Sequence, residues 1–163
     1  MTLSYFVAGI PQPQGSKTAF VVKGRAVIAD AGTAKSRKAH KSWRQSVHNA
    51  TVEALSDEDE WSPLDEAVTV ELGFYFPATA SDPHRHLHTV TPDLDKLVRL
   101  VLDSLVTGKM LKDDARVCNL HAFKHFAQPD DQTGCQIIVT PRGREAVKQK
   151  ALRQALARSP VRA

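Results

Sequence analysis

One stretch, residues 91–117, limits the folds open to this chain more than any other segment. Its apolar residues recur at the three-and-four spacing that lines one face of an α-helix, while charged residues take the other positions. The apolar set is Leu94, Leu97, Val98, Val101, Leu102 and Leu105. Pro92 disfavours helix before it, Asp93 is a good N-cap residue, and Thr107-Gly108 supplies a stop. The stretch therefore predicts an amphipathic helix with a charged outer face.

Four carboxylates flank this helix, two at its start and two after the Gly-containing turn. They are Asp93, Asp95, Asp113 and Asp114. They repel one another unless a cation lies between them, and a hard divalent cation such as Mg²⁺ prefers oxygen ligands. An Asp at a helix start is also an ordinary cap, and acidic turns are common solvated features. The residue types alone leave a metal site and a solvated acidic surface both open.

The run from Asp93 to Val117 resembles the signature of the RusA family of Holliday-junction resolvases. In that family, two Asp residues separated by Leu open an apolar helix that carries a basic residue near its start and an acid near its end. A short Gly-containing turn, a second acidic pair and a Val follow. The matching residues in this sequence are Asp93, Leu94, Asp95, Arg99, Asp103, Gly108, Asp113, Asp114 and Val117.

The resemblance implies a catalytic magnesium site, with manganese as an alternative ion, whose ligands are Asp93, Asp95 and Asp114. It also implies a catalytic basic residue at Arg99. Two residues depart from the family pattern, because Lys96 stands in place of the usual Asn and Arg99 in place of the usual Lys. Arginine keeps the charge that stabilises a phosphoryl transition state, but it stays protonated and cannot transfer a proton. The departures bear on the rate more than on the reaction class.

The formal net charge of +4 is unevenly distributed. Residues 17–44 carry eight Lys or Arg and one acid, residues 142–163 carry seven and one, and the rest of the chain is acidic. Carboxylates between basic flanks suit a metal-dependent enzyme that acts on a polyanion, and a solvated basic surface is the alternative. The Gly-Ser-Lys turn at residues 15–17 lacks the spacing of a P-loop, so no nucleotide cofactor is expected. The candidate nucleic-acid contacts are Lys17, Arg25, Lys96 and Lys124.

Three histidines, His84, His86 and His88, alternate in a loop before the helix. In an extended segment they would project to one side and could bind zinc, but no Cys or acid at a suitable spacing completes such a site. We expect instead a basic loop that leads DNA toward Asp93.

Apolar periodicity predicts a second helix at residues 33–55 and several strands. The predicted strands are 4–8, 19–22, 25–29, 67–77, 115–126 and 134–140. The second and third should form a small hairpin, and the last two should pair with each other. No βαβ alternation is evident, so we expect one α+β domain over residues 1–141, a small mixed or antiparallel sheet with helices packed on one side. Residues 142–163 should form a basic helix or tail.

Together with the resemblance, these features predict a magnesium-dependent endonuclease that resolves Holliday junctions by paired symmetric nicks, in DNA recombination and repair or in phage DNA processing. Two cuts related by two-fold symmetry require two matched sites, so we expect a homodimer bound to a four-way junction. The alternatives are a non-catalytic branched-DNA-binding protein and a metal-dependent phosphohydrolase of a small phosphate ester. Since no apolar run is long enough for a membrane span and no export signal opens the chain, we expect a cytoplasmic protein.

Overall fold

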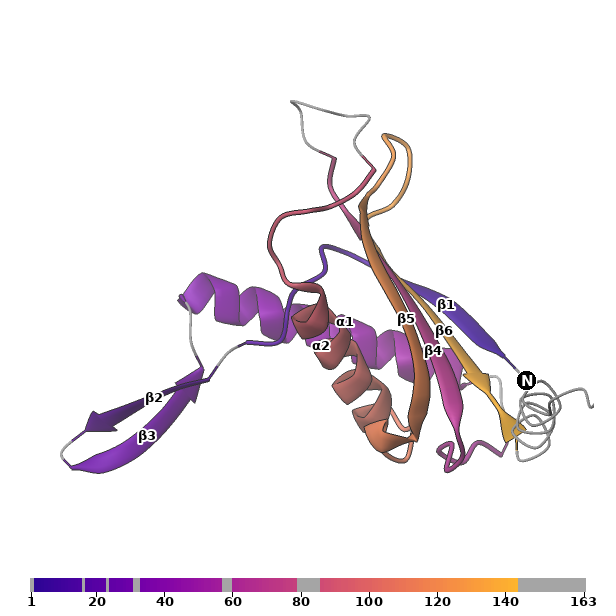
Figure 1. Cartoon of the computed structure of the whole chain (residues 1–163), viewed down its shortest axis with the longest axis horizontal. Helices are drawn as coiled ribbons and strands as arrows, with labels where there is room; N and C mark the ends of the chain where they lie inside the picture. The colour runs from indigo at the N-terminus through magenta and orange to yellow at the C-terminus, as the bar shows by residue number, and fades with distance from the viewer. Residues whose placement is uncertain are drawn as a thin grey trace, which may run out of the picture.

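The computed structural model describes residues 2–15, 17–22, 24–30, 33–56, 60–78 and 86–143. In this part of the chain, two α-helices, one turn of 3₁₀ helix and six strands follow one another (Figure 1). They are β1 (Leu3–Ala8), β2 (Lys17–Val22), β3 (Arg25–Asp30), α1 (Ala34–Ala54), β4 (Val68–Phe76), α2 (Leu94–Thr107), η1 (Asp114–Arg116), β5 (Val117–Phe126) and β6 (Gly134–Pro141). Both helices cover the same side of the main sheet, and the β2–β3 hairpin projects away from it. The expected α+β architecture is confirmed.

The main sheet has the strand order β1-β6-β4-β5. β4 and β5 are parallel and joined through α2, so they form one βαβ unit that the sequence pattern did not predict. β6 lies antiparallel between β1 and β4, so the expected pairing of residues 115–126 with residues 134–140 is wrong. The reason lies in β4, where residues 68–70 and 72–74 are all buried. A strand buried to this extent needs a hydrogen-bonding partner on each edge, and β6 and β5 supply them.

The predicted apolar face of α2 packs on this sheet. Leu97, Val101 and Leu105 are fully buried in the same core as the inward side chains of β4. Burying a side chain of this size contributes about 1.5–3 kcal/mol. The apolar stripe sets the rotation of the helix about its axis and thereby leaves Asp95 and Arg99 exposed on the opposite side.

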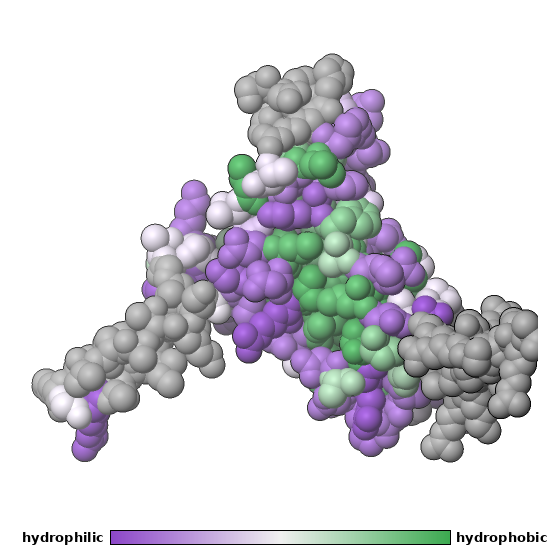
Figure 2. All heavy atoms as spheres, in the orientation of Figure 1, coloured by the Kyte–Doolittle hydropathy of each residue, from purple (hydrophilic) through white to green (hydrophobic). Residues whose placement is uncertain are grey.

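Apolar side chains also remain accessible along α2 and β5. Leu120 is 44% exposed, and Leu102 and Val106 are only partly buried. We call these three residues the α2–β5 surface; Figure 2 shows hydrophobic residues gathered over α2 and β5, with hydrophilic residues around them. β5 is also the edge strand, and in the described part of the chain no strand pairs with the outer edge of its residues 117–123.

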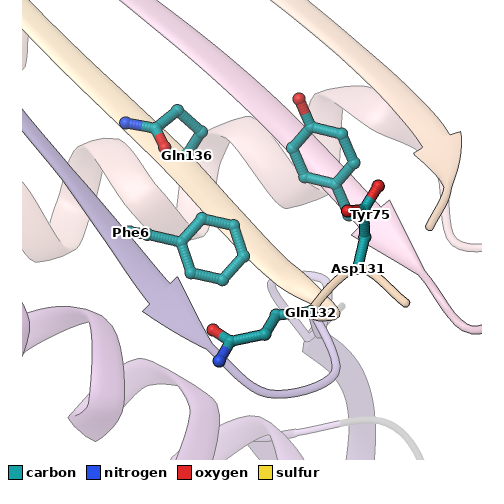
Figure 3. Close-up of a pocket in the computed structure, with 5 residues that line it drawn as sticks. All are labelled: Phe6, Tyr75, Asp131, Gln132 and Gln136. Carbon is teal, nitrogen blue, oxygen red and sulfur yellow. The ribbon is translucent and has the colours of Figure 1, made fainter. Parts of the chain in front are cut away.

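The other face of the sheet carries no helix among the described elements. Strand alternation places Phe6, Tyr75, Phe123 and His125 on it, with neighbouring ring centroids 4.6 to 6.5 Å apart. A shallow pocket of about 310 Å³ opens at one end of this face. Figure 3 shows its lining residues, Phe6, Tyr75, Asp131, Gln132 and Gln136.

His84 and the basic segment 144–163 lie outside the described residues. His86 is exposed, and its Nδ1 lies 3.1 Å from Nε2 of Gln128. His88 is buried and stacks on Phe76, with ring centroids 4.1 Å apart. These two histidines therefore do not share one exposed side, and His88 is a core residue.

In the part of the chain that the structure describes, no helix combines the length and the apolar character that a membrane span requires.

Candidate active site

The first turn of α2 carries Asp93 and its counter-ion. Asp93 is the N-cap and Gly108 the C-cap of this helix, as predicted. The Asp93 side chain makes no capping hydrogen bond; its Oδ2 instead lies 2.9 Å from Nζ of Lys96. The hydrogen bond from Lys96, together with its charge, holds the pKa of Asp93 below its usual value and raises the pKa of Lys96. Asp93 therefore stays ionised at neutral pH.

Two contacts hold the backbone around this turn. Lys124 of β5 donates from Nζ to the carbonyl oxygens of Val90 and Pro92, at 2.6 Å each. The backbone N–H of Gln14 donates to the carbonyl of Lys96 at 2.9 Å. Lys124 therefore lies close to the start of α2, where two of the three N–H donors of its ammonium group bind the protein. Its role as a DNA contact stays a prediction.

Asp95 and Arg99 are both exposed on the outer side of α2. They are four residues apart and are therefore neighbours on the helix surface. A permanent cation thus lies one helical turn beyond the acidic start of the helix.

The second acidic pair lies at the other end of α2. Oδ1 of Asp113 accepts a hydrogen bond of 2.8 Å from the backbone N–H of Ala115, so Asp113 caps η1. Asp114 is exposed and lines a pocket of about 280 Å³. The pocket is lined by Arg44, Asp103, Val106, Thr107, Asp113 and Asp114. Because Asp113 is already used as a cap, Asp114 is the better candidate ligand of the pair.

The two acidic ends do not meet within one chain. α2 has 14 residues and is therefore about 21 Å long. Asp114 lies beside Val106 and Thr107 in its last turn, whereas Asp93 and Asp95 belong to its first. In agreement with this separation, no group of three or more His, Cys, Asp or Glu side chains is arranged to hold a metal among the described residues. The predicted metal ligands therefore fall into two separate groups in a single chain. Asp93 and Asp95 lie at the start of α2, and Asp114 lies near its end; we call these two groups the half-sites.

A family model described as "Endodeoxyribonuclease RusA" matches residues 16–140, which include both half-sites and most of the chain. The chain belongs to the RusA endodeoxyribonuclease family. The resemblance that the segment from Asp93 to Val117 carries is thereby confirmed. Membership in the RusA family indicates an endonuclease of the kind that resolves Holliday junctions. A comparison with curated proteins gives no match.

Two further candidate DNA contacts of this RusA-family chain lie on the projecting hairpin. Lys17 begins β2, and its side chain lies outside the described part of the structure. Arg25 begins β3 and is exposed. The hairpin that these two strands form projects away from the helices in Figure 1.

Sequence reasoning missed one ion pair in this RusA-family site. Nη2 of Arg44 in α1 lies 2.9 Å from Oδ2 of Asp103 in α2, and both side chains are partly exposed. The two residues are 59 positions apart, and no local periodicity links them. From the sequence alone, Arg44 is only one of the eight Lys or Arg residues of the basic segment 17–44.

Proposed function

We propose that this protein is a magnesium-dependent homodimeric endodeoxyribonuclease that cuts four-way DNA junctions with paired, symmetric nicks, in recombination and repair or in phage DNA processing. The observation that carries the proposal is the RusA family match over residues 16–140, a span that contains the exposed carboxylates at both ends of α2. Acting on branched DNA also agrees with the basic segment 17–44.

The predicted metal ligands are carboxylates, which suit a hard divalent cation, but they do not form a complete metal site within one chain. Asp93, Asp95 and Asp114 are exposed carboxylates, the ligand type that Mg²⁺ prefers. Since α2 is about 21 Å long and Asp114 lies beside its last turn, whereas Asp93 and Asp95 lie at its start, the proposed site needs a second copy of the chain. Asp93 and Asp95 of one subunit would combine with Asp114 of the other.

A two-fold axis beside α2 satisfies this requirement. If the two copies of α2 lie antiparallel across the axis, the first turn of each helix faces the last turn of the other. An isologous contact of this kind forms two identical sites, which is what two symmetric cuts require. The same arrangement explains why the two half-sites lie at opposite ends of one helix.

The α2–β5 surface supports such a contact. Leu102, Val106 and Leu120 present uncharged apolar area on the side of the molecule where α2 lies (Figure 2). Apolar residues at an interface centre favour association, whereas phosphate binding requires cations. Among the described residues, no strand pairs with the outer edge of residues 117–123 of β5, so their backbone groups could also bind a second copy.

A Mg²⁺ ion held by these carboxylates would provide a Lewis acid and would lower the pKa of a water bound to it. The side chains contribute the remaining functions. Arg99, one turn beyond Asp95, stabilises negative charge that develops on the phosphoryl group. Lys124 holds the carbonyls of Val90 and Pro92 and so positions the first turn of α2.

A non-catalytic role on branched DNA is the second candidate, and one observation favours it. Asp93 is engaged by Lys96, a residue that stands where the family usually has Asn. If this ion pair prevented metal binding, the protein would bind junctions without cutting them.

The deciding experiment measures cleavage of a labelled mobile four-way junction beside a linear duplex of the same sequence, with magnesium and with chelator. Symmetric nicks in the junction that require magnesium are expected. Tight junction binding without nicks would replace the nuclease by the non-catalytic binder. If neither binding nor cleavage occurs, the junction is not the substrate, and small phosphate esters would then be assayed.

A further inference from the structure

We infer that the pocket beside Asp114 is a binding site for a DNA phosphate and that Arg44 is its phosphate-binding residue. The inference rests on the proposed function and adds a residue to it. Arg44 lies in α1, which the family motif around α2 does not include. Among the described residues, Arg44 is the one cationic side chain that lines this pocket.

The guanidinium of Arg44 is held in place by two acceptors. Its Nη2 lies 2.9 Å from Oδ2 of Asp103 and 3.4 Å from Oε1 of Gln14. The backbone of Gln14 is held as well, because its N–H donates to the carbonyl oxygen of Lys96 in the first turn of α2. A guanidinium has five N–H donors, and both of these contacts use the same nitrogen. The geometry thus orients the group and leaves N–H donors that neither contact uses.

The charges around the pocket explain why a cation is needed there. Asp103, Asp113 and Asp114 all line it, so a phosphate approaching Asp114 meets negative charge. Arg44 offsets this charge from within the same pocket. Its planar fork matches the oxygens of a phosphate, and charge-assisted hydrogen bonds of this kind are the stronger ones.

The surface that leads to the pocket along α1 is also basic. Lys41 precedes Arg44 by three positions and is its neighbour on the helix surface. Lys38 and Lys41 line a further depression of about 370 Å³ on α1. Lys38, Lys41 and Arg44 follow one another at three-residue intervals along α1, so a DNA backbone bound to these lysines would lie close to Arg44.

Only a structural role competes with this inference. The Arg44–Asp103 pair joins α1 to α2, and it could serve that purpose alone. The two roles predict different responses to salt, because a residue that neutralises a phosphate contributes to counterion release and a residue that joins two helices does not.

The experiment measures junction affinity against salt concentration, in the presence of chelator so that no cleavage occurs, for the wild type, Arg44→Gln, Arg44→Lys and Asp103→Asn. Arg142→Gln is the matched control, since Arg142 is an exposed arginine hydrogen-bonded to Thr69 on the opposite face of the sheet. The melting temperature of each variant is measured alongside.

For Arg44→Gln we expect roughly tenfold weaker binding at low salt and a slope of log K against log salt that is shallower by about one. Arg44→Lys should keep the slope, because the charge remains, while losing part of the affinity. Asp103→Asn should keep the slope, because Arg44 is intact, and should lower the melting temperature, because the Arg44–Asp103 ion pair is lost. Arg142→Gln should keep the wild-type slope.

The inference is overturned if Arg44→Gln and Asp103→Asn lower the melting temperature equally while both keep the wild-type slope. It is overturned as well if Arg142→Gln reduces the slope as much as Arg44→Gln. Failure of the proposed function would look different, because the wild-type protein itself would then neither bind nor cut the junction.

Discussion

Nζ of Lys96 lies 2.9 Å from Oδ2 of Asp93, three residues earlier at the start of α2. A cationic side chain is thus bound to the first of the proposed metal ligands. A metal ion at Asp93 must therefore compete with an ammonium group that is covalently part of the same helical turn. The family's usual residue at this position, Asn, would impose no such competition.

Lys96→Asn is therefore expected to lower the magnesium concentration that gives half-maximal junction cleavage, by roughly two- to fivefold, the range that measured exposed ion pairs correspond to. A magnesium titration of the cleavage rate measures the change. Arg142→Gln, which removes one positive charge on the opposite face of the sheet, is the control and should behave as the wild type. An unchanged magnesium requirement in Lys96→Asn would show that the ion pair does not compete with the metal.

The same ion pair predicts how stability depends on pH. The pKa of Asp93 is lower in the folded protein than in the unfolded chain, where it is about 3.9. The contribution of Asp93 to the free energy of unfolding is therefore present above about pH 3.9 and is lost as the pH falls through the pKa of the folded state. The pKa of Lys96 is higher in the folded protein than in the unfolded chain, where it is about 10.4. The contribution of Lys96 to the free energy of unfolding is therefore present below about pH 10.4 and is lost as the pH rises through the pKa of the folded state.

The melting-temperature difference between the wild type and Lys96→Asn should accordingly be constant from about pH 5 to pH 9 and shrink at both extremes. At both pH extremes, a constant melting-temperature difference should remain, because Asn has a lower helix propensity than Lys. Both side chains are exposed, so the difference is small. A difference that changes near pH 7 would assign the titration to another group.

The local features of the fold could be predicted from the sequence because short-range chemistry determines them. The N-cap and C-cap positions of α2, Asp93 and Gly108, are those predicted, and its buried face follows from the spacing of its leucines and valines. Strand pairing is not local in this way. The sequence predicted a hairpin between the last two strands, whereas β4, most of whose residues are buried, pairs with β5 along one edge and with β6 along the other.

The candidate site shows the same difference between features that local sequence determines and features that depend on distant contacts. Asp93, Asp95 and Arg99 lie as predicted on one end of one helix, because the 3.6-residue period is sufficient to place them. That Asp95 and Asp114 lie apart follows from the length of α2, but the proposed contact between subunits would leave no periodic signal in one sequence. The Arg44–Asp103 pair depends on how α1 crosses α2, which no local pattern encodes.

Arg99 should respond differently to two substitutions. Arg99→Lys keeps the positive charge one turn beyond Asp95 and is expected to cleave junctions at least as fast as the wild type. Arg99→Ala removes the charge and should lower kcat by about a hundredfold, as the loss of one charge-stabilising donor does in other enzymes. Single-turnover cleavage rates test both, with junction affinity as the control for binding. Full activity of Arg99→Ala would remove this residue from the reaction.

Lys124 provides a test of how the first turn of α2 is supported. Lys124→Met keeps the length of the side chain but loses both hydrogen bonds, to Val90 and to Pro92. We expect a melting temperature lower by about 2–12 °C, which corresponds to the net contribution of two hydrogen bonds in a chain of this size. Calorimetry measures it. An unchanged melting temperature with a shallower salt dependence of junction binding would instead make Lys124 a DNA contact.

The two half-sites allow a decisive mixing experiment. Asp95→Asn and Asp114→Asn should each abolish cleavage in a homodimer, because every site then lacks a ligand. In a heterodimer of these two variants, co-expressed with different affinity tags, one site combines both substitutions. The other site combines the unchanged Asp95 of one subunit with the unchanged Asp114 of its partner. We therefore expect magnesium-dependent nicking that is restored but limited to one strand of the junction.

The heterodimer of Asp93→Asn with Asp95→Asn is the control, because both substitutions affect the same half-site and leave neither site intact. If the carboxylates acted within one chain, the first heterodimer would be as inactive as the control. Recovery of single nicks in the first heterodimer alone requires a metal site shared between subunits.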